Sequence, residues 1–444
     1  MDLLILQIII GICFLGLVII LFFEKYDYIY YSMLFILIGA LITAIFIPEA
    51  RTIEFYIMTI EWEIIFFMIG LFLIVEVLKE QKIIDEIAMR VVDRYQDNPR
   101  KLFYVFCLIT TLFASIIAAI SIVIIFIPLI ITACRKLEIN PVPYLLGVSV
   151  CINLSATLTP FGSAQNIIIS NEFNLDFMWF LVNIFPYFIF TFVLTIILLD
   201  KFVLSKEIKK YNISKKEKKS NMKKTIFKDE HIDKKVFNKN IVALFIFFCL
   251  LIFSPEIYLA ALIGAIIFVS INPIKNKEGK KRMSLNHYLQ KIDYKLIYFF
   301  ICLFIFVGLM QLNGTIAIFE KAIENLSAED EFILAVLILI ITSILSGFLD
   351  NTPVTIMFIP IIKILVGLSE FYSNSLLIAF ILGINLGGNF LPQGSAADML
   401  ILESGRNYEL KDLTFKRMFK VGSTFSVLHI LIGIGYLALI IFIF

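Results

Sequence analysis

The stretch around residue 350 reads GFLDNTPVTIMFIP and places polar side chains inside a long apolar run. Asp350 supplies a carboxylate, Asn351 and Thr352 follow it directly, and the helix breaker Pro353 comes next. A carboxylate at membrane depth is energetically expensive, so such a residue is a functional candidate by default. Asp350 could hold Na⁺ or carry a coupled proton, and its two neighbours could bind the ion or a solute. The alternative is that these four residues form a surface turn between two full spans.

Two other polar stretches match each other at a constant spacing. NLSATLTPFGSAQNIII begins at Asn153 and NLGGNFLPQGSAADMLI begins at Asn385, which is an offset of 385 − 153 = 232 residues. Pro160 in the first and Pro392 in the second lack an N–H and disfavour helix at the preceding residue. The pattern therefore predicts two broken helices near the bilayer midplane. Their freed backbone groups could coordinate a cation or an anionic group.

Side chains within the two stretches could supply further ligands for an ion or a solute. The candidates in the first stretch are Asn153, Ser155, Thr157, Thr159, Ser163 and Asn166. The candidates in the second are Asn385, Asn389, Ser395 and Asp398, with Gly387 and Gly388 loosening the turn. The alternative is that these small residues let transmembrane helices pack closely. Because the motif occurs twice, binding is the favoured interpretation.

The first half departs from this pattern at one place. The same offset sets residues 118–121, Ala-Ala-Ile-Ser, opposite the polar tip at 350–353. The predicted site is therefore asymmetric, because the second half supplies most of its polar side chains. Glu76 is another ionisable residue in an apolar run, but it lies near the cytoplasmic end of that run, which favours snorkelling or structural pairing. Lys363 is open to either interpretation.

The composition indicates a polytopic membrane protein. Of 444 residues, 60% are hydrophobic and 17% are charged, and the mean hydropathy is +0.95. Soluble domains are closer to half apolar and a quarter charged. The net charge of +2 gives no indication of nucleic acid as a partner. The six cysteines are scattered singly and the three histidines lie far apart, which favours packing roles over a metal site.

Apolar segments that could cross a bilayer recur along the whole chain. They cover 3–23, 28–47, 62–79, 102–134, 142–170, 177–199, 241–253, 256–271, 294–312, 332–368, 374–402 and 418–444. The segments 102–134 and 332–368 exceed the roughly 20 residues of one crossing, so each is predicted to form a re-entrant helical hairpin. The first segment follows no basic region, so we expect it to be a span and not a cleaved signal peptide.

Charge predicts the sidedness of the loops. Residues 201–239 carry fourteen Lys against five acidic residues, and KNKEGKKR at 275–282 is a second basic loop. Basic loops favour the cytoplasmic side, whereas the acidic stretches 48–61 and 171–176 are expected outside. The resulting prediction is a multi-pass protein of the cell membrane with both termini outside and 201–239 in the cytoplasm.

The repeat predicts how the chain is organised. The offset of 232 also pairs FIP at 126–128 with FIP at 358–360. Each half holds about five crossings and one hairpin, and an odd number of crossings turns the second half upside down. The predicted fold is therefore all-α with two inverted repeats, an architecture of many secondary transporters. The expected units are a first repeat at 1–200, a basic linker at 201–240 and a second repeat at 241–444.

These motifs resemble the ion transporter superfamily, over nearly the whole chain. That group joins arsenite-efflux and NhaD-type sodium/proton antiporters with citrate-transporter-like proteins and dicarboxylate/sodium symporters. SGFLDNTPVTIMFIP is similar to its hairpin-tip signature, and the stretches beginning at Asn153 and Asn385 resemble its two unwound helices. The resemblance implies a fixed scaffold and a moving part that carries the solute as an elevator. With an aspartate in place of a serine at position 350, the hairpin tip is more similar to that of the arsenite-efflux and NhaD-type members.

The predicted function is secondary active transport of a small anion or oxyanion, coupled to H⁺ or Na⁺. The expected partners are the lipid bilayer and that solute, with homodimer formation left open. No cofactor or bound metal is expected beyond a coupling Na⁺, and no catalytic role is assigned. The alternatives are a Na⁺/H⁺ antiporter that uses Asp350 and, in a different class, an ion channel. An intramembrane enzyme would need paired catalytic groups that the sequence does not supply.

Overall fold

The computed structural model describes residues 3–20, 28–95, 97–116, 119–205, 207–208, 232–254, 256–275, 281–282, 285–292, 294–315, 330–348, 351–368 and 373–443. Asp350 and most of the basic linker lie outside these ranges. The described part of the chain is almost entirely helical. Its one sheet pairs two short antiparallel strands, β1 (Ile274–Lys275) and β2 (Lys281–Arg282).

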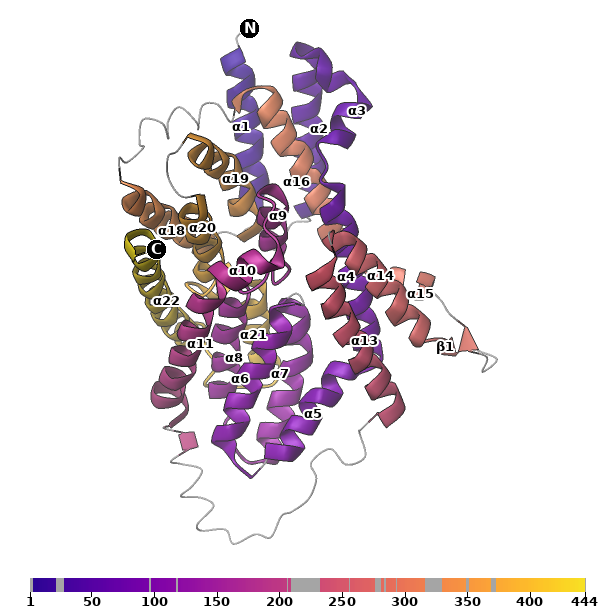
Figure 1. Ribbon diagram of the computed structural model, residues 1–444, viewed down its shortest axis with the longest axis vertical. Helices are drawn as coiled ribbons and strands as arrows, with labels where there is room; N and C mark the ends of the chain where they lie inside the picture. Colours follow the sequence, from indigo (N-terminus) through magenta and orange to yellow (C-terminus); the bar gives the residue numbers. More distant parts are fainter. Residues whose placement is uncertain are drawn as a thin grey trace.

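The first half of the chain forms helices of spanning length together with shorter pieces (Figure 1). Its elements are α1 (Leu3–Ile20), α2 (Tyr28–Phe46), η1 (Pro48–Arg51), α3 (Ile53–Met58), α4 (Trp62–Glu80), α5 (Ile83–Tyr95), α6 (Pro99–Ala114), α7 (Ala119–Lys136), α8 (Val142–Ser155), α9 (Ala164–Glu172), α10 (Phe177–Asn183), α11 (Phe185–Leu199) and η2 (Asp200–Leu204). The long segment 102–134 is thus divided between α6 and α7, which contact each other.

The second half has a corresponding series. Its helical elements are α13 (Lys234–Phe253), α14 (Ile257–Ile271), α15 (Leu285–Leu289), α16 (Tyr294–Leu312), α18 (Glu331–Phe348), α19 (Asn351–Leu368), α20 (Ser373–Gly387), η3 (Pro392–Gly394), α21 (Ala396–Asn407) and α22 (Phe415–Ile443). The long segment 332–368 is divided between α18 and α19, which are also in contact.

The helix boundaries repeat at the offset seen in the sequence. Adding 232 to the bounds of α4 gives 294–312, the bounds of α16, and adding 232 to α7 gives 351–368, the bounds of α19. Helix contacts repeat in the same way. For example, α7 packs on α21, and their counterparts α19 and α9 pack on each other. The internal repeat is therefore present in the helices as well as in the residues.

One predicted boundary was wrong. The apolar segment predicted at 241–253 has only 13 residues, but α13 begins at Lys234 and is 20 residues long. The Asp233 side chain accepts a hydrogen bond from the Lys235 N–H at 2.9 Å and caps the helix. Residues 201–204 likewise continue the helical path of α11 as η2. The predicted linker is thus helical at both of its described ends. Polar residues interrupt the apolar pattern of a sequence, but they do not by themselves end a helix.

The outer surface of the helices is apolar, as a protein in lipid requires. Among the described residues, five helices are long and apolar enough to cross a membrane, and they lie within 29–46, 185–204, 234–252, 331–348 and 415–443. Large apolar side chains on them face outward, for example Phe245, which is 69% exposed, and Leu431, which is 60% exposed. Soluble monomers rarely expose apolar patches on this scale. The chain is an integral membrane protein.

The spanning helices form two groups that each draw on both halves of the chain (Figure 1). The α4 group consists of α1, α2, α4, α13, α14 and α16. The α8 group consists of α6 to α11 and α18 to α22, and it contains both prolines of the predicted helix breaks. Contacts between the groups include those of α9 with α4, α10 with α13, and α19 with α16.

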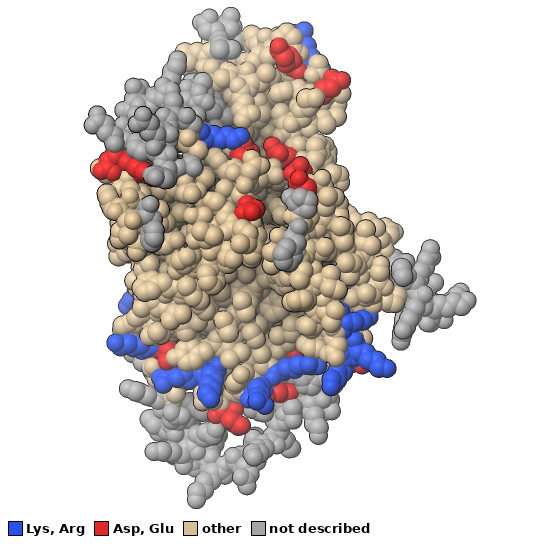
Figure 2. All heavy atoms as spheres, viewed as in Figure 1, with Lys and Arg blue, Asp and Glu red and all other residues tan. Residues whose placement is uncertain are grey.

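Charged side chains are unevenly distributed between the two ends of the molecule. Figure 2 shows Lys and Arg gathered across the lower end of the view, where α5 and the start of α6 lie, and Asp and Glu mainly in the upper part. The N-terminal helix and the end of α22 both lie in the upper half (Figure 1). The middle of the molecule is nearly free of charged atoms on the face shown (Figure 2).

Candidate functional site

The first interrupted helix is present where Pro160 predicted it. Helix α8 ends at Ser155 and α9 begins at Ala164, with no helix in between. The Ser163 hydroxyl caps α9 by accepting from the Asn166 N–H at 3.3 Å. The Asn166 side-chain amide closes the loop, because it donates to the Ala156 carbonyl at 2.7 Å and to the Thr159 carbonyl at 2.9 Å. Freed carbonyls of the loop are thus satisfied within the protein.

The second interrupted helix contains Pro392. Helix α20 ends at Gly387, the short η3 holds Pro392, and α21 begins at Ala396. Both sequence predictions of a helix break are confirmed. The two breaks differ in detail, because only the second has a 3₁₀ turn at its proline among the described residues.

Glycines let α18 approach the second interrupted helix closely. A Cβ on Gly387 would overlap the Ser343 carbonyl oxygen and lie 2.8 Å from the Ser346 Cβ. A Cβ on Gly394 would lie 2.8 Å from the Gly347 carbonyl oxygen. Any side chain at these two positions would therefore push backbone away. Gly388 differs, because a Cβ there meets atoms no nearer than 3.5 Å.

Side chains from each interrupted helix reach across to the other. The Asn153 Nδ2 donates to Asp398 Oδ2 and to Asn389 Oδ1, both at 2.9 Å. The Ser395 hydroxyl donates to Asn153 Oδ1 at 3.0 Å. In the opposite direction, the Asn385 Nδ2 donates to Asn166 Oδ1 at 2.7 Å. The Ser163 hydroxyl donates back to Asn385 Oδ1 at 3.2 Å.

These contacts are related by the offset of 232. Asn153 and Asn385 correspond, and so do Asn166 and Asp398, since 398 − 166 = 232. The Asn153 to Asp398 bond is therefore the counterpart of the Asn385 to Asn166 bond. Each interrupted helix thus contributes an asparagine that donates to the corresponding position of the other. We call these cross-linked side chains the crossing network.

Asp398 breaks the symmetry of the crossing network, because it places a carboxylate where the first half has an amide. It is 4% exposed. Its Oδ1 accepts from the Ser149 hydroxyl at 2.6 Å, and its Oδ2 accepts from Asn153. Within the described residues, no Lys, Arg or His forms an ion pair with it. A buried carboxylate held only by neutral donors is suited to exchange a proton or to accept a cation.

The hairpin between α18 and α19 also reaches the second interrupted helix. The Ser346 hydroxyl hydrogen-bonds to the Asn351 Oδ1 and to the Ile384 carbonyl oxygen on α20. The Asn351 Nδ2 lies near Gly388. Thr352 is buried, and Asp350 lies outside the described residues. Asn351, which was predicted to lie at a hairpin tip, is thus placed near the break in the second helix.

Not every predicted ligand joins the crossing network. Ser155 and Thr157 donate to carbonyls within their own turn, those of Ile152 and Leu154, at 2.6 and 2.8 Å. Thr159 donates to the Ser115 carbonyl at the end of α6. These three hydroxyls hold the first loop and its neighbour together. Gly387, as described above, serves close packing.

The other two ionisable candidates are engaged in ion pairs. The Glu76 carboxylate lies 3.0 Å from Lys79 Nζ on the same helix, which confirms its predicted structural pairing. Lys363 on α19 pairs with Glu172 at the end of α9. Lys363 therefore ties the second hairpin to the first interrupted helix and is absent from the crossing network.

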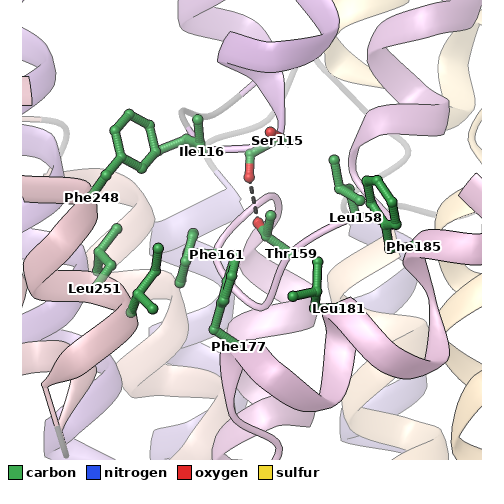
Figure 3. A pocket seen from close by; sticks show the side chains of 11 residues that line it. Ser115, Ile116, Leu158, Thr159, Phe161, Phe177, Leu181, Phe185, Phe248 and Leu251 are labelled. Carbon is green, nitrogen blue, oxygen red and sulfur yellow. Dashed lines mark hydrogen bonds between the residues drawn. The ribbon is translucent and has the colours of Figure 1, made fainter. Parts of the chain in front are cut away.

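An apolar cavity of about 190 Å³ lies beside the first interrupted helix (Figure 3). One wall is α13, from which Phe248 and Leu251 face the cavity, and the opposite wall is formed by the loop 158–161 together with α10 and α11. The bond between Thr159 and Ser115 joins two residues that line the cavity (Figure 3). The cavity thus lies between the α4 group and the α8 group, which contact each other elsewhere, and it is distinct from the crossing network.

Comparison with protein families identifies the kind of protein. The model of the citrate transporter family (CitMHS) matches residues 17–370 and, in a second match, 250–444. This chain belongs to the citrate transporter family. The match covers both interrupted helices and the hairpin between α18 and α19. Membership agrees with the predicted resemblance to the ion transporter superfamily.

Relatives of this chain are named as transporters or membrane proteins. An uncharacterized transporter of Methanocaldococcus jannaschii is 25% identical over 91% of this chain and 96% of its own length. A 46 kDa membrane protein of Mycobacterium leprae is 24% identical over 78% of this chain and 79% of its own. A chain of Dictyostelium discoideum named as an arsB transporter is 29% identical over 24% of this chain and 19% of its own. These names point to transport and away from an enzymatic activity.

Three polar residues of the candidate site were not predicted from the sequence. Ser149 contacts Asp398, Gln165 donates to Asn385 Oδ1 at 2.9 Å, and Ser346 joins Asn351 to α20. A signal for Ser149 exists in its spacing, because it lies one helical turn before Asn153 on α8. Gln165 and Ser346 carry no such signal, since only the packing of α9 and α18 against α20 brings them into contact.

Proposed function

We propose that this chain is a secondary active transporter that moves a small anion or oxyanion, coupled to H⁺ or Na⁺. The observation that carries the proposal is the crossing network, in which two interrupted helices hold four amides and one carboxylate together out of reach of water. Buried polar side chains and unwound backbone at membrane depth are the usual construction of a transporter's solute site. Membership in the citrate transporter family and the names of the relatives support transport as the activity.

The proposed architecture is a pair of inverted repeats, each with about five crossings and a re-entrant hairpin, joined by the cytoplasmic linker 201–239. Two observations support it. The helix bounds and the crossing contacts recur at the offset of 232, and each long apolar segment is divided into two contacting helices. The basic lower end of Figure 2 would face the cytoplasm, and the ends of the chain would face outward.

An elevator movement is proposed for the α8 group, with the α4 group as the scaffold. The apolar cavity supports this assignment, because it lies between a wall of α13 and a wall made by the loop 158–161, α10 and α11. Two helix groups whose apolar side chains do not interdigitate can slide past each other. A closely packed interface between the groups would resist that movement.

Filling the cavity is therefore expected to slow transport. Leu251→Trp places an indole in the space between the two groups and should lower the transport rate about tenfold or more while the protein stays folded. Phe245→Trp is the matched control, because Phe245 is on the same helix and 69% exposed on its outer side. Initial uptake rates and thermal unfolding should be measured for both variants. A Leu251→Trp protein as active as the control would show that the cavity keeps its volume throughout the cycle.

Asp350 is proposed to hold the coupling ion at the tip of the second hairpin. Replacing it by asparagine should abolish or uncouple transport and leave expression and folding unchanged, because a residue between α18 and α19 can lose its charge without losing packing volume. Coupling is measured as uptake with and without an imposed Na⁺ or pH gradient. Unaltered, still-coupled uptake by Asp350→Asn would remove this residue from the mechanism.

The deciding test of the function uses purified protein in liposomes and a panel of labelled anions, with imposed Na⁺ or pH gradients. Accumulation of an anion against its own gradient would support the proposal. A second candidate is a Na⁺/H⁺ antiporter, which the buried carboxylate of Asp398, held by the neutral donors Ser149 and Asn153, favours. That activity predicts Na⁺-driven pH changes in liposomes that contain no other solute. Conductance without coupling would indicate a channel.

A further inference from the structure

One donor in the crossing network lacks a partner. Asn389 is 2% exposed, and its Nδ2 has no hydrogen-bond partner within the described residues. A buried donor left unpaired costs about 1 to 3 kcal/mol, so native proteins rarely keep one without a reason. The corresponding residue of the first repeat is Thr157, since 389 − 232 = 157, and its hydroxyl is satisfied by the Leu154 carbonyl. The unpaired donor is thus specific to the second repeat.

The orientation of the Asn389 amide follows from its neighbours. In the structure, Asn153 presents its Nδ2 to Asp398 Oδ2 and donates a hydrogen bond to it. The same Nδ2 lies 2.9 Å from the Asn389 amide, which must therefore present its oxygen in return. Reversing the Asn389 amide would set two N–H₂ groups against each other.

The Nδ2 of Asn389 consequently points away from this chain of bonds and has no hydrogen-bond partner within the described residues. Two N–H bonds of an amide match an oxygen acceptor, such as a carboxylate or oxyanion oxygen, and do not match a metal cation. Asn389 lies in the interruption between α20 and η3, where the helix of the second repeat has lost its regular bonding. A ligand that fits this donor therefore presents an oxygen acceptor, which the anion of the proposed function has.

We propose that Asn389 donates a hydrogen bond to an oxygen of the transported anion, and that Asp398 holds Asn389 in this orientation through Asn153. The inference rests on the proposed function and adds the residue that recognises the solute. Asp398 carries a charge of the same sign as the solute, so its effect on Asn389 comes from fixing the amides and not from attraction. Asn153 and Asp398 are positioning residues in this arrangement.

The direct test is Asn389→Asp, which keeps the shape of the side chain and replaces the two N–H donors by an acceptor. A site built around a donor rejects a mismatched group strongly, so uptake should fall by about 100-fold or more. The probes are radiolabelled citrate, sulfate and phosphate, and the one that the wild type takes up fastest is used throughout. Asn389→Ser is the milder variant, expected to raise KM about tenfold with little change in kcat.

The matched control is Asn374→Asp on the same helix, α20. Asn374 accepts a bond from the Trp179 Nε1 through its Oδ1 at 2.9 Å, and an aspartate keeps that acceptor. Its uptake should equal that of the wild type. Wild-type KM in Asn389→Ser, or wild-type uptake by Asn389→Asp, would overturn the inference and leave the proposed function standing. If the wild type takes up none of the three probes, the inference and the proposed function both fail.

The positioning role of Asn153 has its own readout. Asn153→Leu should raise KM in the wild type but should have a much smaller effect when Asn389 is already serine, because the residue through which it acts has been changed. Independent roles would instead make the two effects multiply, and that result would show that Asn153 does not act through Asn389. Both outcomes are read from uptake kinetics of folded protein, so a general loss of stability does not imitate them.

Discussion

Asp398→Asn is expected to give a folded protein that no longer accumulates solute against a gradient. An asparagine can keep both hydrogen bonds, because its oxygen can face Asn153 while its nitrogen donates to the Ser149 hydroxyl. The corresponding position of the first repeat is already an amide, Asn166, and it accepts an equivalent bond from Asn385. The substitution therefore removes a charge and little else, and the free energy of unfolding should change by less than about 2 kcal/mol.

The measurement is uptake by proteoliposomes with and without an imposed pH or Na⁺ gradient, together with thermal unfolding of the purified protein. Ser149→Ala is the control, because it removes one bond to the same carboxylate and keeps the charge. It should cost about 1.5 to 3 kcal/mol of stability and preserve coupling. If Asp398→Asn still concentrates solute, its carboxylate is structural, and coupling depends on Asp350 without Asp398.

Gly387→Ala is expected to disrupt the second interrupted helix through packing alone. The added methyl would overlap the Ser343 carbonyl oxygen and lie 2.8 Å from the Ser346 Cβ, so α18 and α20 would have to separate. Overpacking of this kind costs about 1 to 3 kcal/mol or more. Alanine also gains about 1 kcal/mol over glycine in helix propensity. Because the clash is with backbone, which cannot rotate away, we expect the packing cost to dominate.

The expected result is a lower unfolding temperature and a loss of transport, since α18 also positions Ser346 against Asn351. Gly435→Ala on α22 is the matched control. A Cβ at Gly435 meets no atom within 4 Å, so the helix gains propensity without a clash and the unfolding temperature should stay equal or rise. Equal unfolding temperatures for the two variants would contradict the predicted clash, because α18 and α20 would then accommodate a methyl group at Gly387.

The two helix breaks and the repeat could be predicted because each follows from local chemistry. A proline removes a backbone donor wherever it stands, and a run of apolar residues as long as a bilayer requires a helix whatever surrounds it. Pro160, Pro392 and the constant offset were therefore sufficient to locate both interruptions. The predicted start of α13 was wrong because five of the seven residues from Lys234 to Asn240 are polar, and hydropathy does not detect that they are also helical.

The sequence by itself determined that this is a polytopic membrane protein with a duplicated, interrupted helix, and it supplied most of the polar residues of the site. Only the tertiary structure decided which of them meet. It joined Asn153 to Asp398 and Asn385 to Asn166, turned Ser155 and Thr157 back onto their own turn, and brought in Ser149 and Gln165. The physical reason is that hydrogen bonds between segments more than 200 residues apart depend on how helices pack, and side-chain type alone does not encode that packing.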